Sequence, residues 1–291
     1  MSGHPLRGTA STARRIAAGV LLAGAFQGAC AAEAPEDGPP PGWFGPPPGW
    51  SGGVLVGAVL HPDFQGSRTS RAEPALGGIV TYRSDNVGVL EAGSRGATWT
   101  FLLHQDAALA LRLGLDPGRI DSGQRRLTPF GERPGSQRLQ GMGDVDMTPV
   151  VSLAGSLTAG GVPLTATLRQ ATASYAGAML ELGANLPFEP LRHVKLSVAP
   201  TLSFADRRTM QAYFGVTEAQ ALAAHRTAFD THAGLQSAQL AIDLDVALAP
   251  HWHLDATCQA RHLLGDAADS PVTEQRRQAS GMLALVYQFS P

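Results

Sequence analysis

The residues whose types and spacing could support catalysis are His253 and Asp255, which lie two positions apart. An imidazole held by a carboxylate activates the nucleophile in many hydrolases. On a strand these two side chains share a face but stand about 7 Å apart, and the chain has no Gly-x-Ser-x-Gly nucleophile motif. The pattern favours two polar side chains of a strand over a hydrolase site, and we expect no enzymatic activity.

Metal-ligating residue types also occur at short spacing. His251 and His253 share a strand face, as in some metal sites, but no third ligand follows at a spacing that is typical of such sites. Gly265, Asp266 and Asp269 could offer oxygens to Ca²⁺, although their spacing does not match an EF-hand loop and Gly, Asp and Ser are ordinary turn residues. We therefore expect neither a metal site nor another cofactor.

Residues 1–31 have the pattern of a secretory signal peptide. Arginines precede the apolar run IAAGVLLAGAFQGA at 16–29, and a small-residue cleavage site follows it. The run is shorter than the roughly 20 residues that span a bilayer. Cys30 is either removed with the peptide or acylated as the new N-terminus, and the sequence leaves both open. Cys258 then has no disulfide partner within the chain.

Residues 32–51 are predicted to form a Pro-rich periplasmic spacer, in which PPPGW occurs twice. Such a segment adopts an extended polyproline-type conformation. The aromatic side chains Trp43, Phe44 and Trp50 punctuate the prolines, so they are the candidate contact with a periplasmic partner.

Composition limits the remaining chain. Charged residues make up 16% of the 291 residues, and the net charge is −2. Proteins that bind nucleic acid carry a basic face, so we expect no nucleic-acid partner. Two cysteines exclude a disulfide-dense scaffold.

From residue 52 to residue 289 the dominant pattern is a hydrophobic period of two. The segments are about ten to fourteen residues long, against five or six in most soluble sheets, and a tilted membrane strand needs roughly 9–11. Short links at 84–86, 104–106, 158–161, 187–191 and 250–251 alternate with mostly longer ones. The sequence therefore predicts a closed, antiparallel, transmembrane β-barrel of about twelve strands, with ten as the alternative.

Successive side chains of a strand point to opposite faces, and the charged residues of the predicted strands all occupy positions on the polar face. A basic residue facing lipid at mid-membrane would cost about 2–4 kcal/mol, so we expect these side chains to face the lumen: Arg112, Arg169, Glu181, Lys195, Asp243, Asp245, Asp255 and Arg261.

Residues 209–224, TMQAYFGVTEAQALAA, break the alternation and predict a short helix in an outer loop, capped by Thr217. The stretches MQAYFGV and LLGDAADSP resemble the MipA/OmpV family of outer-membrane proteins, as do HPDFQGS at 61–67, GRID at 118–121, GMGDVD at 141–146 and the terminal LVYQF. The loop residues that carry the resemblance are Met210, Tyr213, Phe214, Gly215, Val216, Gly265, Asp266, Ser270 and Pro271.

The resemblance implies a protein of the outer membrane of a Gram-negative bacterium, in contact with outer-membrane lipid. Some family members are described as scaffolds that join a murein hydrolase to a murein synthase, and others as porin-like or adhesive. The family brings no catalytic residues. An even strand count puts both termini in the periplasm, so a murein enzyme would meet the short turns or the spacer. The sequence leaves the oligomeric state open.

Overall fold

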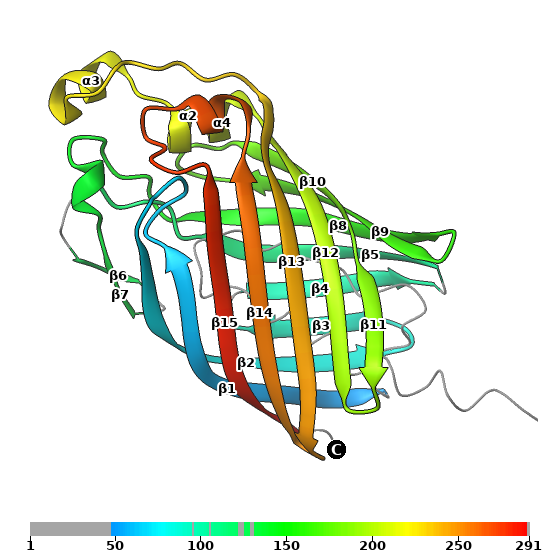
Figure 1. The fold of residues 1–291 in the computed structure, drawn as a ribbon. Helices are drawn as coiled ribbons and strands as arrows, with labels where there is room; N and C mark the ends of the chain where they lie inside the picture. Colours follow the sequence, from blue (N-terminus) through cyan, green and yellow to red (C-terminus); the bar gives the residue numbers. More distant parts are fainter. Residues whose placement is uncertain (1–47, 95, 105, 122–124, 129–130, 290–291) are drawn as a thin grey trace, which may run out of the picture.

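The computed structural model describes residues 48–94, 96–104, 106–121, 125–128 and 131–289. Within them one large antiparallel sheet forms the wall of a barrel (Figure 1). Its strands are β1 (Gly49–Pro62), β2 (Ser70–Ser84), β3 (Gly88–Gly93), β4 (Gly96–Leu103), β5 (Ala107–Asp116), β8 (Thr148–Ala159), β9 (Val162–Ala171), β10 (Ala178–Ala184), β11 (Leu186–Leu191), β12 (Val194–Ala205), β13 (Gly234–Ala249), β14 (Trp252–Leu263) and β15 (Arg277–Phe289). A separate hairpin pairs β6 (Arg125–Thr128) with β7 (Gly131–Pro134).

The barrel closes where β10 pairs with β12, with Met179 opposite Ala205 and Gly183 opposite Thr201. Because every other neighbouring pair in the wall is also hydrogen-bonded, the sheet has twelve strands in the ring and one extra strand, β11. The predicted closed barrel of twelve strands is confirmed. Closure matters in lipid, where an open edge would leave backbone groups unpaired.

The extra strand corrects one predicted link. Residues 187–191 are not a turn but part of β11, which pairs with the start of β12, and the turn is formed by Arg192 and His193. The two prolines of LPFEPL suggested a turn, yet Pro187 lies opposite Ser197 in an edge strand. An edge strand tolerates a residue without an N–H, because that side needs no ladder partner.

The two ends of the barrel differ. At one end, the turn end, β2–β3, β4–β5, β8–β9, β11–β12 and β13–β14 are joined by links of two or three residues. Gly49, the first residue of β1, and Phe289, the last of β15, lie at this same end (Figure 1). At the opposite loop end, the connections of β5 to β8, β12 to β13 and β14 to β15 are long. Because β1 begins at Gly49, Trp50 belongs to the barrel wall rather than to the predicted spacer.

Side chains alternate between the two faces of the wall. In β13, Leu240 and Ile242 are 44% and 41% exposed on the outside, whereas Gln239 and Asp243 are each 7% exposed on the inside. This places the apolar face toward lipid, as the period of two predicts.

The inner face is not polar all round. Leu55 and Val59 of β1 pack inside the barrel with Met282 and Val286 of β15 and with Ala75 of β2. Val54 and Val56 of the opposite parity are exposed to lipid. The middle of β1 and of β15 is therefore apolar on both faces, which blurs the alternation of their sequences.

The exposed Trp and Phe side chains of the described residues all lie toward the turn end: Trp50, Trp99, Phe101, Phe188, Trp252 and Phe289. Ring contacts join Trp50 to Tyr82, Trp99 to Phe101, and Trp252 to Tyr287. The exposed aromatic side chains of the described residues are thus concentrated at one end of the barrel.

The loop end carries the helices: a 3-10 turn (Gln137–Leu139), α2 (Arg207–Phe214), α3 (Glu218–Ala224) and α4 (Gly265–Asp269). The capping role of Thr217 is confirmed, since its side chain and that of Gln220 form a capping box at the start of α3. The prediction of a single helix was incomplete, because Asp206 caps the additional helix α2 by accepting a hydrogen bond from the backbone N–H of Thr209. Among the described residues, no helix combines the length and apolar character needed to cross a membrane.

Candidate functional site

The β12–β13 loop forms a cap at the loop end of the barrel (Figure 1). Met210, Tyr213 and Phe214 of α2 are 1%, 9% and 0% exposed. They belong to one apolar cluster with Val145 of the β5–β8 loop, Met179 of β10, Ala205 of β12, Leu263 of β14 and Ala267 of α4. The segment MQAYFGV therefore joins parts of the rim that are distant in sequence.

The carboxylate of Asp116, the last residue of β5, anchors this cap. The Tyr213 hydroxyl lies 2.7 Å from both of its oxygens, and the Tyr175 hydroxyl donates to Oδ2 at 2.6 Å. The backbone N–H of Gly118 donates to Oδ1 at 2.8 Å. Asp116 is 7% exposed, and these donors compensate for the loss of water around its charge.

Arg119 makes a second tie to the same tyrosine. Its Nη1 donates to the carbonyl oxygen of Tyr213 at 2.7 Å. Burial of the guanidinium lowers the pKa of Arg119 to about 10. The side chain is therefore still cationic at neutral pH, and it is enclosed between the β5–β8 loop and α2.

Two of the stretches that carry the family resemblance pair with each other. Arg119 and Val145 form an antiparallel bridge between GRID and GMGDVD. Asp144 accepts from the backbone N–H of Asp121 at 2.9 Å, and Asp121 accepts from the N–H of Gly143 at 2.8 Å. These carboxylates organise backbone turns, which explains their position in the sequence.

A second apolar cluster lies beside the first. It gathers Phe64 of the β1–β2 loop, Leu139, Met142, Val216 and Val272. Polar ties reinforce it: the Gln220 amide donates to the Met142 carbonyl, and the Arg226 guanidinium donates to the carbonyls of Arg138 and Pro271. Four loops thus share small cores of their own, as a folded cap does.

The GDAADS stretch is also occupied by contacts within the chain. Asp266 accepts hydrogen bonds from the backbone N–H and the ring Nδ1 of His232, and these contacts lower its pKa. Asp269 pairs with Arg276 at 2.7 Å, and the Ser270 hydroxyl donates to the Phe214 carbonyl at 2.5 Å. Gly265 has a positive φ of 50° at the first residue of α4. The segment fastens α4 to the neighbouring loops.

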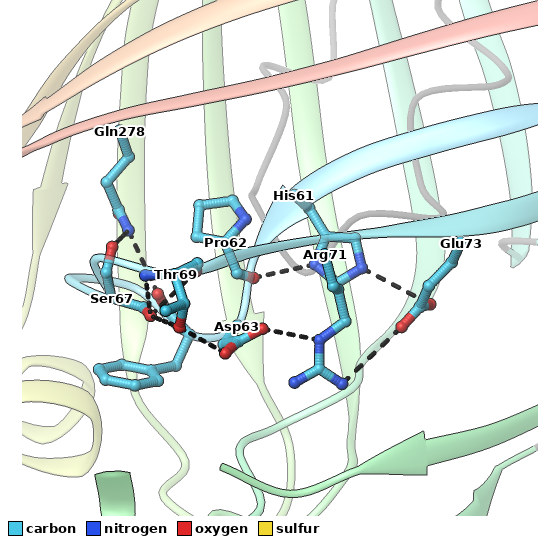
Figure 2. Close-up of polar contacts among 9 residues, drawn as sticks. His61, Pro62, Asp63, Ser67, Thr69, Arg71, Glu73 and Gln278 are labelled. Atoms are coloured by element: carbon cyan, nitrogen blue, oxygen red, sulfur yellow. Dashed lines mark hydrogen bonds and ion pairs between the residues drawn. The ribbon is translucent and has the colours of Figure 1, made fainter.

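The HPDFQGS stretch builds a polar network at the end of β1 (Figure 2). Asp63 accepts from Arg71 Nε at 2.8 Å and from the Thr69 hydroxyl at 2.6 Å. Burial opposes the charge of Asp63, but these hydrogen bonds outweigh it and hold its pKa below the ordinary value. His61 donates from Nδ1 to the Pro62 carbonyl, and its Nε2 lies 3.5 Å from Glu73.

The same loop is tied to the β14–β15 loop. The Gln278 amide accepts from the N–H of Gly66 at 3.0 Å and donates to the carbonyl of Ser67 at 3.0 Å. Glu274 accepts from Arg138 and from the N–H of Arg68. Burial works against the charge of Glu274, yet the net effect of these donors is a lowered pKa.

Inside the barrel, His253 does not pair with Asp255. Its Nδ1 donates instead to Asp245 on the neighbouring strand at 2.9 Å. Asp255 faces Asp245 across the β13–β14 pair and is 2% exposed, and neither of its oxygens accepts a hydrogen bond from a described residue. Asp243 accepts from Thr257 at 2.8 Å. The structure thus brings three acidic side chains together on the inner wall.

The other predicted lumen charges lie on several strands of the wall, and one of them, Lys195, adjoins this group. Arg169 and Glu181 approach to 3.9 Å between β9 and β10, and Arg261 donates twice to Gln239. Lys195 is half-buried opposite Asp245 in the β12–β13 register, and Arg112 of β5 is half-buried.

No three His, Cys, Asp or Glu side chains in the part of the chain that the structure describes are grouped so that they could hold a metal ion. Of the candidate spacer contacts, Trp43 and Phe44 lie outside the described residues. Trp50 is 63% exposed beside Tyr82.

Sequence reasoning missed Asp116, Tyr175 and Arg119, the partners of Tyr213. No local sequence pattern distinguishes Asp116, the last residue of β5, or Tyr175, which lies in the short connection between β9 and β10. Two of the four tyrosines of the chain fall in predicted links rather than strands, and this is the one signal that could have pointed to them.

Among solved structures the chain is similar to the KdgM porin, with 8% identity and a TM-score of 0.42 over 81% of this chain and 99% of that one. It is also similar to the channel DcaP of Acinetobacter baumannii, with 8% identity and a TM-score of 0.37 over 82% and 96% of the two chains. Similarities of this degree carry no information on function. No curated protein matches at a significant level.

The protein-family model described as MltA-interacting protein MipA matches residues 54–289, which is nearly the whole barrel. Its span contains the cap, the inner charges and all strands except the first residues of β1. The chain therefore belongs to the MltA-interacting protein MipA family and is a β-barrel of the outer membrane of a Gram-negative bacterium.

Proposed function

We propose that this protein is a non-enzymatic scaffold that holds murein-remodelling enzymes at the outer membrane, namely a murein hydrolase of the MltA type and a murein synthase. The family description, MltA-interacting protein, supports a hydrolase as the first partner. Lipid surrounds the barrel wall, and the enzymes bind at one end of it.

The observation that carries the proposal is the position of the chain ends. Gly49 and Phe289 both lie at the turn end of the barrel. Short turns face the periplasm in bacterial outer-membrane barrels, and murein lies on that side. The start of β1 therefore faces the periplasm, and we propose that the segment before it meets the murein enzymes there. Trp43 and Phe44 in that segment, with the exposed Trp50, are the proposed contact.

The contacts of His253 on the inner wall support the proposal that the protein is not an enzyme. The imidazole of His253 is engaged by Asp245, and no Ser or Cys hydrogen-bonds to this imidazole among the described residues. A hydrolase needs its base within hydrogen-bond reach of the nucleophile. The polar inner face serves the barrel instead.

The test is co-purification of the hydrolase and synthase with variants of the full chain. Because β1 begins at Gly49, residues 35–47 can be replaced by a Gly/Ser segment of equal length without shortening the strand. We expect this replacement to abolish capture, and Trp43→Ala with Phe44→Ala to weaken it. The matched control is Trp99→Ala, which removes an exposed tryptophan from the same end of the barrel. Unchanged capture by the spacer replacement would refute the spacer contact.

A porin-like channel is the second candidate function, because charged and polar side chains line much of the inner wall. Adhesion, another role ascribed to the family, would use the outer loops. Conductance in a planar bilayer separates a channel from a scaffold: steady ion-conducting steps by the unmodified chain would favour the channel.

A further inference from the structure

Tyr213 and Asp116 connect parts of the rim that do not adjoin. Three strands, β8, β9 and β10, lie between β5 and β12 on the shorter way round the barrel. Asp116 ends β5, while Tyr213 lies on α2 just after β12. Their hydrogen bond therefore passes over part of the barrel mouth instead of following the rim.

The contacts of α2 reach farther across. Phe214 and Met210, both at most 1% exposed, belong to the same cluster as Leu263 at the end of β14, which is on the other side of β12. On the β14 side the helix is held by apolar packing against Leu263. On the β5 side Val145 also packs against it, and the polar bonds of Asp116 and Arg119 to Tyr213 add to that packing.

The polar attachment depends on a buried carboxylate, that of Asp116, which has few hydrogen-bond donors. Asp116 is nearly buried and forms no ion pair with a described residue. Its charge depends on two phenol hydroxyls and one backbone N–H. If the hydroxyls are lost, the carboxylate keeps a single donor, and exposure to water becomes the better alternative.

The turn that carries Tyr175 adds strain. Ser174 and Ala176, on either side of Tyr175, have φ of 51° and 47°, in the left-handed region that non-glycine residues seldom adopt. The Tyr175 hydroxyl bond to Asp116 is a contact that holds this turn in place. Its loss would let the turn relax away from the mouth.

We infer that Tyr175, Tyr213 and Asp116 form a releasable latch, which keeps the β12–β13 loop closed over the loop end and seals the interior against ions. The closed cap is the resting state, and release of the phenol donors opens it. The latch is separate from the scaffold contact, which lies at the opposite end of the barrel.

The chain offers a matched test, because its other two tyrosines, Tyr82 and Tyr287, lie near the turn end. The double variant Tyr175→Phe/Tyr213→Phe removes two hydroxyls from the latch and leaves the rings. The control Tyr82→Phe/Tyr287→Phe removes two hydroxyls elsewhere. Each full-length protein is refolded, checked for β-sheet content, and measured for single-channel conductance in KCl.

We expect the unmodified protein and the control to stay almost silent, and the latch variant to show openings on the order of ten-fold more often. Hydrogen exchange of the α2 amides supplies a second readout, faster in the latch variant only. The inference is overturned if the latch variant is folded and as silent as the unmodified protein, or if the control opens equally. It is also overturned if the unmodified protein conducts steadily.

Discussion

The hydroxyl of Tyr213 lies 2.7 Å from each carboxylate oxygen of Asp116, a residue 97 positions earlier in the chain. This contact joins the segment MQAYFGV to the end of β5. It gives a physical reason for a tyrosine in an otherwise apolar helical face, since the ring packs with Met210 and Phe214 while the hydroxyl meets a buried charge. The loop motifs are thus parts of one folded cap.

Close packing of β1 against β15 requires a glycine at position 57. A Cβ there would lie 2.2 Å from the carbonyl oxygen of Leu283 and 2.7 Å from the Cα of Ala284. Since both are backbone atoms of the neighbouring strand, we expect Gly57→Ala to lower the free energy of unfolding by about 1–3 kcal/mol. Urea unfolding in detergent micelles measures it. Gly234→Ala, where a Cβ meets nothing within 4 Å, is the control, and equal stability of both variants would contradict this packing.

In the acidic group on the inner wall, a substitution is expected to raise the free energy of unfolding rather than lower it. Asp255 faces Asp245, and neither of its oxygens accepts a hydrogen bond from a described residue. At alkaline pH, where both facing carboxyl groups are ionised, Asp255→Asn keeps the shape, removes one of the two charges and supplies an N–H₂ that can donate to Asp245. We expect the free energy of unfolding to rise by about 1–3 kcal/mol. The control is Asp85→Asn at an exposed position of the β2–β3 turn, which should leave the free energy of unfolding almost unchanged. A loss of stability in Asp255→Asn would show that the carboxylate is needed.

The β1–β2 loop should loosen in acid. The folded-state pKa of Asp63 is below its ordinary value, so its bonds from Thr69 and Arg71 stabilise the loop fully above about pH 4. That contribution is lost as the pH falls below this value and Asp63 takes up a proton. We expect the protection factors of the amides of residues 64–69 to fall in this range. In Asp63→Asn they should be lower throughout and keep only the pH dependence that Glu274 contributes at the N–H of Arg68. If the protection of these amides in the unmodified protein did not change with pH, the stabilising role of Asp63 would be contradicted.

How much of this could be predicted from the sequence depends on the range of the interactions. The strand pattern, the closed barrel and the Thr217 cap follow from local periodicity and capping chemistry, so they were predictable. The contacts of Asp116 with Tyr175 and Tyr213 are 59 and 97 residues apart, and no local pattern encodes them.

One error and one missed contact have the same origin. Prolines in LPFEPL suggested a turn, because the sequence does not reveal that β11 is an edge strand. The bond of His253 to Asp245 could not be predicted, because strand register, which places Asp245 beside it, is set by the whole sheet.

The orientation of the barrel can be measured on intact cells. In a Cys258→Ser background, Leu222→Cys places a thiol on α3, where the native side chain is 80% exposed. Asp85→Cys places one in a short turn at the other end. We expect a membrane-impermeant maleimide to label position 222 directly and position 85 only after the outer membrane is permeabilised. The reverse labelling pattern would put the spacer on the wrong side for murein.

The most direct test of the account is the binding of a purified MltA-type murein hydrolase to the full-length mature chain in lipid nanodiscs. We predict saturable binding that is lost when residues 35–47 are replaced by a Gly/Ser segment and is kept when Tyr175 and Tyr213 are changed to Phe. A correctly folded barrel that binds no hydrolase, or that binds it equally well without the native spacer, would contradict the proposed scaffold.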